Sequence, residues 1–183
     1  MDGRDIMAGV LGCPICRAEY PIVDGVAHFD DACGAARTPA VAADEAEAMR
    51  LAAFLDLSDP RGFAVLVGSL GAHARLVQRL TAVHLLLVDP PREIEMGQGI
   101  SGLTAGGALP LAHGSARGVA LDERATPALL LAASLVVRPG GRLVAPISHE
   151  VPPGITELVR DERVWIGARE PSSVSAPIGL RRA

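Results

Sequence analysis

Two cysteines stand close enough in the sequence to act together. Cys13 and Cys16 are separated by two residues, and a tight turn at this spacing directs both sulfur atoms the same way. Such a pair supplies half of a tetrahedral zinc site, with each sulfur about 2.3 Å from the metal. His28 and Cys33 follow at a spacing that can complete it, so Cys13, Cys16, His28 and Cys33 form a candidate zinc site. Two alternatives stay open: Cys13 and Cys16 are a dithiol redox pair, or His28 and Cys33 are ordinary packing and linker residues.

A glycine-containing turn is the second candidate for chemistry. Gly68 and Gly71 follow one apolar run, and Asp89 ends the next one. Glycines let a backbone approach a ligand, a helix N-terminus offers N–H groups, and a carboxylate can accept hydrogen bonds from ribose hydroxyls. Gly68, Ser69, Gly71 and Asp89 are therefore candidate contacts to a nucleotide-like ligand. The alternative is a compact strand-to-helix turn without a ligand.

Asp122 is the remaining candidate catalytic residue. It follows a short apolar run, and the C-terminal ends of strands line the ligand crevice in open α/β sheets. The alternative is an ordinary acidic complement to the N-terminus of a helix that starts beside Thr126.

Composition and charge exclude several classes of protein. All 17 cationic residues are arginine, which excludes mechanisms that need a Schiff-base, Walker or general-base lysine. The net charge of -4 gives no reason to expect nucleic acid as a partner. The longest uninterrupted apolar run, residues 128–133, is far shorter than the roughly 20 residues of a membrane span. The first 12 residues lack the pattern of a secretion signal, so we expect a cytoplasmic protein.

Hydrophobic patterning predicts alternating strands and helices after a turn-rich N-terminal segment. We expect helices at 41–57, 72–80 and from Thr126 to about residue 137, with Pro127 in the first helical position. We expect strands at 63–67, 84–88, 118–121 and 142–147, one short strand within 97–109, and a hairpin of 155–160 with 164–168. A turn at 138–141 separates the last helix from the strand that follows it. This order predicts an α/β fold with a mostly parallel sheet and flanking helices.

The same patterning predicts the organisation of the chain. Residues 1–34 form a small module, and the Ala- and Pro-containing segment 35–39 marks the boundary. Residues 40–170 form the main domain, and residues 171–183 form a flexible tail.

Residues 11–26 carry a cysteine knuckle followed by Tyr-Pro-Ile-x-Asp-Gly-Val. This stretch resembles the small zinc-ribbon activator family that partners tRNA, ribosomal and release-factor methyltransferases. The cysteine pair that usually precedes this knuckle in the family is absent. The resemblance implies a zinc-ribbon-like β module that binds or stabilises a partner.

Four further segments, at residues 65–68, 87–89, 109–115 and 136–143, together resemble class I S-adenosylmethionine-dependent methyltransferases in order and spacing. The resemblance implies a Rossmann-like fold. It places Gly68, Ser69 and Gly71 at the turn that holds S-adenosylmethionine, and Asp89 at the ribose.

This chain departs from the family at most of the polar positions. Leu66 and Leu70 replace an acidic residue and the central glycine, and Ala105 and Arg117 replace two further acidic residues. The first hypothesis is therefore a methyltransferase-like protein with a degenerate cofactor site that acts as a binding or regulatory partner, for another protein or a second copy. The alternative is an active S-adenosylmethionine-dependent methyltransferase with an acceptor near Asp122.

Overall fold

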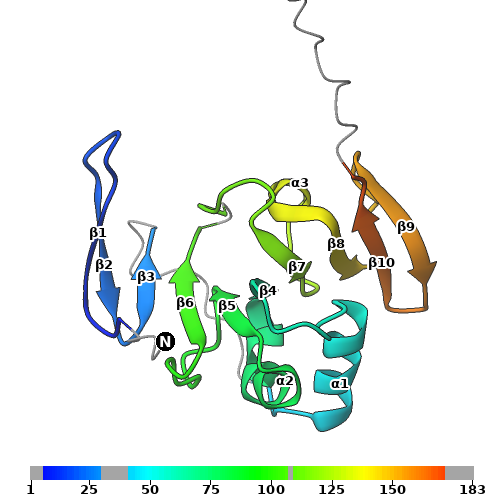
Figure 1. Cartoon of the computed structure of the whole chain (residues 1–183), viewed down its shortest axis with the longest axis horizontal. Coiled ribbons are helices and arrows are strands. Elements are labelled where there is room, and N and C mark those ends of the chain that lie inside the picture. Colours follow the sequence, from blue (N-terminus) through cyan, green and yellow to red (C-terminus); the bar gives the residue numbers. More distant parts are fainter. Residues whose placement is uncertain (1–5, 30–40, 107–108, 172–183) are drawn as a thin grey trace, which may run out of the picture.

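The computed structural model describes residues 6–29, 41–106 and 109–171. In this part of the chain one sheet of ten strands runs through the molecule, in the order β1-β2-β3-β6-β5-β4-β7-β8-β10-β9 (Figure 1). Cys33, the boundary predicted at 35–39 and most of the predicted tail lie outside the described residues.

The elements have the following bounds. The strands are β1 (Gly9–Gly12), β2 (Glu19–Val23), β3 (Val26–His28), β4 (Phe63–Val67), β5 (His84–Val88), β6 (Ile100–Thr104), β7 (Ala116–Ala120), β8 (Val137–Pro146), β9 (Ile155–Arg160) and β10 (Val164–Arg169). The helices are α1 (Glu45–Phe54), the 3-10 helix η1 (Gly68–His73), α2 (Ala74–Thr81) and α3 (Pro127–Val136).

The sheet is parallel in its middle and antiparallel at both ends. Neighbouring strands from β3 to β8 run parallel, whereas β1, β2 and β3 pair antiparallel at one end and β8, β10 and β9 at the other. The prediction of an α/β fold with a mostly parallel sheet is confirmed. No helix in the described parts of the chain is long and apolar enough to span a bilayer.

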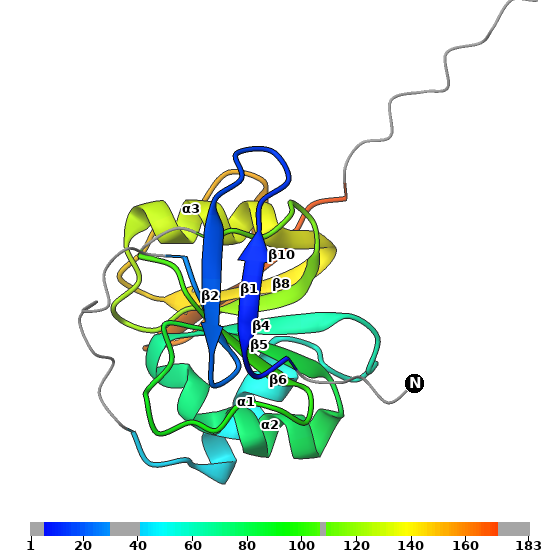
Figure 2. The same ribbon diagram turned by 90° about the vertical axis from the view of Figure 1, so that its left-hand side faces the viewer.

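Helices cover the two faces of the sheet. Val65 and Val67 of β4 belong to a core cluster with α3, while Ala64 and Leu66 belong to a second cluster with α1 and α2. Successive side chains on a strand point to opposite faces, so one short strand contributes side chains to both core clusters. Figure 2 shows α3 above the sheet and α1 with α2 below it. Because both faces are covered, β4 is apolar along its whole length rather than alternating.

The sequence predicts α3 well and mislocates the start of the strand after it. The Thr126 hydroxyl accepts a hydrogen bond from the Leu129 N–H at 3.2 Å and caps the helix. Pro127 occupies the first helical position, which proline favours. The expected turn at 138–141 is instead part of β8, which begins at Val137 beside Ala116. The pairing of β7 with β8 shifts its register between Ala116 and Gly118, which leaves these residues within the strand as an irregularity. Gly141 lies where a Cβ would collide with the Arg117 carbonyl.

The N-terminal hairpin continues the central sheet. β3 pairs in parallel with β6, and Phe29 donates its N–H to the Thr104 carbonyl at 3.0 Å. Ile22 and Ala27 are buried in the same core cluster as the central strands. The edge strand of the central sheet is therefore paired and covered by the chain's own N-terminal segment.

Candidate functional site

The predicted ligand residues lie at one end of the parallel sheet. Gly68, Asp89 and Asp122 each follow the C-terminal end of a parallel strand, namely β4, β5 and β7. β4 lies between β5 and β7 in the sheet. Sequence reasoning places these residues on separate strands, and the sheet order brings their strands together.

The glycine turn adopts a conformation that requires glycine at its first position. Gly68 has a φ of 64°, in the left-handed region that side chains disfavour. A Cβ at this position would also collide with the Asp122 carboxylate. The α-helix predicted at 72–80 begins at Ala74 as α2, because residues 68–73 form the 3-10 helix η1.

Asp122 closes this turn from the neighbouring strand. Its side chain is buried, and Oδ2 accepts hydrogen bonds from the Ser69 N–H at 2.8 Å and the Ser69 hydroxyl at 3.0 Å. Oδ1 accepts a third from the Arg124 N–H at 3.1 Å. The carboxylate thus satisfies donors of the turn that a bound anionic or hydroxyl-bearing ligand would otherwise use. Residue type and spacing indicate both residues as candidates but do not predict this contact, which joins positions 53 apart.

Asp89 is also engaged within the protein. Its Oδ1 accepts a hydrogen bond from the Ala105 N–H at 3.0 Å, which joins the end of β5 to the segment after β6. The two prolines that follow Asp89 pack against the glycine turn: a Cβ on Gly71 would lie 3.5 Å from both Pro90 and Pro91. Pro91 is buried, so the second glycine of the turn faces proline rings.

Arg117 is a buried residue with a structural role that sequence reasoning missed. Its guanidinium donates to the Asp56 carbonyl at 2.7 and 3.0 Å and to the Asp59 carbonyl at 2.8 Å. Hydrogen bonds from Arg61, with added attraction from Arg117, hold the pKa of the Asp59 carboxyl well below its usual range. Through these hydrogen bonds Arg117 holds the loop between α1 and β4 in place, and its guanidinium does not face the glycine turn.

The two described cysteines lie in the turn between β1 and β2. Cys13 is half-buried and Cys16 is exposed. Backbone N–H groups of Cys16 and Ile15, and then the Cys16 thiol, point toward the Cys13 sulfur and lower the pKa of Cys13. A thiol with a lowered pKa forms the thiolate that both metals and disulfide exchange require.

The structure separates His28 from this cysteine pair. In the register of β2 and β3, Ile22 faces Ala27 and Val23 faces Val26, and His28 follows Ala27 at the end of β3. Its Nδ1 lies 3.2 Å from the Thr104 hydroxyl. Within residues 6–29, 41–106 and 109–171, no three His, Cys, Asp or Glu side chains gather closely enough to hold a metal. The predicted fourth ligand, Cys33, is outside the described residues.

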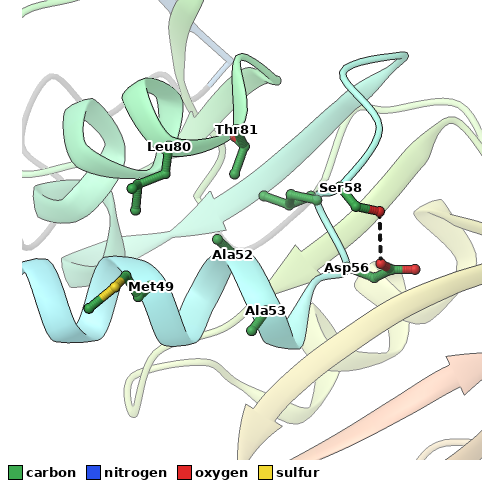
Figure 3. A pocket seen from close by; sticks show the side chains of 8 residues that line it. Met49, Ala52, Ala53, Asp56, Ser58, Leu80 and Thr81 are labelled. Carbon is green, nitrogen blue, oxygen red and sulfur yellow. Dashed lines mark hydrogen bonds between the residues drawn. The ribbon is translucent and has the colours of Figure 1, made fainter.

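A groove of about 340 Å³ lies away from the glycine turn, between α1 and α2 (Figure 3). α1 supplies Met49, Ala52 and Ala53, α2 supplies Leu80 and Thr81, and the loop between α1 and β4 completes the lining. In that loop the Ser58 hydroxyl donates to Asp56 at 3.2 Å. The lining is largely apolar and contains one carboxylate. No pattern in the sequence predicts this groove.

Comparison with known proteins identifies the fold. No protein-family model and no curated protein matches the sequence. A 1,6-didemethyltoxoflavin-N1-methyltransferase from Burkholderia thailandensis has a TM-score of 0.54 at 13% identity, with 70% of this chain and 80% of that chain covered. A putative S-adenosyl-L-methionine-dependent methyltransferase from Methanococcus maripaludis has a TM-score of 0.53 at 10% identity, with 72% and 87% covered.

A third similar structure is a complex. It joins a methyltransferase activator from Haloferax volcanii to a putative methyltransferase, with a TM-score of 0.51 at 11% identity and 69% and 94% covered. The chain spans only 44% of a geranyl diphosphate methyltransferase that it also matches, at 16% identity and a TM-score of 0.47. The chain therefore has the Rossmann-like fold of class I S-adenosylmethionine-dependent methyltransferases.

Proposed function

We propose that this chain is a methyltransferase-fold protein with a degenerate cofactor site, which acts as a binding or regulatory partner rather than as a catalyst. One observation carries the proposal: the buried Asp122 carboxylate accepts both the N–H and the hydroxyl of Ser69 at the glycine turn. The turn that would meet a cofactor is occupied by the chain's own side chain.

The energetics of displacement support this reading. A ligand that needs the Ser69 N–H must first release the hydrogen bonds of a buried carboxylate. Hydrogen bonds to charged groups contribute about 1.5–3 kcal/mol each. Losing one without replacement lowers affinity by roughly 10- to 150-fold, because about 1.4 kcal/mol corresponds to a factor of ten.

The other positions around the turn provide few replacements. Leu66 is fully buried, and Leu70 packs against the core cluster beneath α1 and α2. Ala105 presents no polar side chain, and its N–H is already bonded to Asp89. The residues present therefore do not fit S-adenosylmethionine well, and we derive no methyl-transfer step through it.

The N-terminal hairpin supports the partner-binding part of the proposal. Residues 11–26 resemble zinc-ribbon activators, and one structural neighbour is a methyltransferase in complex with an activator. In this chain the hairpin lies beside β6 as a continuation of the sheet. We infer that the segment supports the methyltransferase-like domain within one chain and leaves its outer surface for a partner.

An active methyltransferase is the second candidate. Its support is the retained arrangement: a left-handed Gly68 and carboxylates after β5 and β7, all at one end of the sheet. In this alternative Asp122 would turn away from Ser69 when the cofactor enters, and Asp89 would hold the ribose.

Titration calorimetry of the whole chain with S-adenosylmethionine separates the two candidates. The proposal predicts no heat of binding at millimolar cofactor for the unchanged protein. Micromolar binding that Asp89→Ala abolishes would establish the alternative. Asp122→Ala tests the cause directly, because removal of the carboxylate frees the Ser69 N–H, and Glu123→Ala is its exposed neighbouring control. Binding gained in Asp122→Ala alone would show that Asp122 closes the site.

A further inference from the structure

The solvent-facing side of α3 consists of apolar residues alone. Ala128, Leu131 and Leu135 are exposed and form one stripe, because positions three and four apart share a face of a helix. Leu131 is 52% exposed and Leu135 is 40% exposed. Ser134, the one polar residue of α3, is buried and donates its hydroxyl to the Leu131 carbonyl at 2.7 Å. A surface helix normally carries polar side chains on its outer face, and α3 carries none.

No other helix of the described chain packs on this face of the sheet. The core cluster beneath α3 contains no residue of α1 or α2, and Figure 2 shows those two helices on the opposite face. The stripe therefore faces away from the core and toward solvent. Removal of its apolar surface from water favours association with a partner that covers it.

The stripe is complementary to a second copy of itself. When two copies of α3 pack antiparallel about a two-fold axis, each contact occurs twice. With the axis at the middle of the stripe, Leu131 meets the half-buried Ala132 of the second copy. Leu135 then meets Ala128 of the second copy. Each large side chain faces a small one, which lets the two helices approach closely and interdigitate.

Charge at the two ends of α3 favours the same arrangement. Glu123 precedes the helix, Arg138 follows it, and both are exposed. An antiparallel copy brings Glu123 of each chain to the end that carries Arg138 of the other, whereas a parallel copy places like charges together. Arg124, beside Glu123, already interacts within its own chain. Complementary charge at the rim of an interface sets the orientation of the partners more than their affinity.

We propose that the exposed stripe of α3 binds the same stripe of a second copy of the chain, with the two helices antiparallel. The stripe spans about two helical turns, so the contact is smaller than the roughly 1,200 Å² that stable interfaces bury. We therefore expect a weak dimer, with a dissociation constant that is micromolar or higher. This inference goes beyond the proposed function, because it concerns a different surface from the glycine turn and does not depend on S-adenosylmethionine.

Sedimentation equilibrium of the whole chain, from micromolar to near-millimolar concentration, tests the proposal. We expect a monomer–dimer equilibrium for the unchanged protein. Leu131→Glu should raise the dissociation constant by at least about tenfold, because it places a charge in the middle of an apolar contact. Leu80→Glu is the matched control, since Leu80 is a leucine of α2 that is 50% exposed, and it should leave the equilibrium unchanged. Urea unfolding followed by Trp165 fluorescence checks that both variants are folded.

Charge reversal tests the antiparallel orientation. Glu123→Arg and Arg138→Glu should each weaken the dimer severalfold, because each variant brings like charges together at both ends of the paired helices. The double variant restores opposite charges, so it should recover the affinity of the unchanged protein.

Three outcomes would overturn the proposal. A monomer at every concentration would exclude the dimer. If that monomer dimerises only when the chain is ended at Pro171, the stripe belongs to residues 172–183, which are attached near the end of α3 where the Arg169 guanidinium donates to the Leu135 carbonyl. A dimer lost in Leu80→Glu and kept in Leu131→Glu would place the contact at the groove between α1 and α2. A double charge variant no tighter than its single variants would contradict the antiparallel orientation.

Discussion

Asp122 is the residue on which the glycine turn depends. Its carboxylate accepts hydrogen bonds from the Ser69 N–H, the Ser69 hydroxyl and the Arg124 N–H. Removal of a buried acceptor leaves its donors without partners, at about 1–3 kcal/mol. We expect Asp122→Ala to lower the free energy of unfolding by that amount in urea titrations followed by Trp165 fluorescence. Trp165 is a suitable reporter because it is the chain's single tryptophan and is fully buried.

The control for this prediction is the next residue. Glu123 is exposed, and exposed substitutions usually change stability by less than about 0.5 kcal/mol. Equal stability of Asp122→Ala and Glu123→Ala would show that the hydrogen bonds of Asp122 do not hold the turn.

Gly68 and Asp122 should be energetically coupled. A Cβ at Gly68 would collide with the Asp122 carboxylate, and the φ of 64° disfavours alanine independently. We expect Gly68→Ala to destabilise the protein by at least about 1 kcal/mol, with part of that loss relieved in the Asp122→Ala background. A double-mutant cycle measured by urea unfolding tests this, and strictly additive effects would contradict the contact.

Asp59 should give the protein part of its acid sensitivity. Hydrogen bonds from Arg61 lower the folded-state pKa of the Asp59 carboxyl. Ionised Asp59 therefore stabilises the fold above the ordinary carboxyl pKa of about 3.9, and this contribution is lost as pH falls below that value. We expect Asp59→Asn to be less stable than wild type at pH 7 and to lose less stability on acidification.

Urea midpoints measured from pH 7 down to the acid limit of folding check this prediction. Glu162→Gln, in the exposed turn between β9 and β10, is the matched charge-removing control. Identical pH profiles for wild type and Asp59→Asn would contradict the role assigned to the Arg61–Asp59 pair.

The N-terminal hairpin should behave as part of the central fold. Ala27 of β3 is buried in the core cluster, whereas Val23 of β2 is 52% exposed. A charge at Ala27 is buried without a partner, so we expect Ala27→Glu to destabilise the whole protein by several kcal/mol. Val23→Glu should have little effect. Trp165 lies in β10, at the other end of the sheet, so a lowered urea midpoint there in Ala27→Glu would report cooperative loss of both ends.

Sequence reasoning predicts elements whose signal is local. The strands at 63–67 and 84–88 are found at those positions because their apolar runs end at clear turns. The hairpin of β9 and β10 forms around Asp161, whose Oδ1 accepts the N–H groups of Arg163 and Val164. α3 begins where Thr126 and Pro127 predict it.

The features that the sequence does not predict depend on pairing between distant segments. β8 begins at Val137 because β7 pairs with residues that local turn chemistry assigns to a loop. The parallel pairing of β3 with β6 joins positions more than 70 residues apart, and no local pattern encodes it. For the same reason the residues of the glycine turn are predictable from type and spacing, but the closure of the turn by Asp122 is not.

The N-terminal hairpin and the candidate site share one continuous sheet. Phe29, which follows β3, bonds to the Thr104 carbonyl at the end of β6. The next residue, Ala105, donates its N–H to Asp89. The position of the Asp89 carboxylate is thus tied to the N-terminal segment through two consecutive residues. The hairpin is therefore joined to the same end of the sheet as the glycine turn.

In the proposed function, the chain's own carboxylate occupies the glycine turn in place of a cofactor. A crystal structure determined with millimolar S-adenosylmethionine tests it most directly. We predict that Asp122 Oδ2 remains within hydrogen-bonding distance of the Ser69 N–H, with no cofactor at the turn. A fully occupied cofactor against residues 68–71, with the Asp122 side chain turned away, would show that the glycine turn is a working cofactor site.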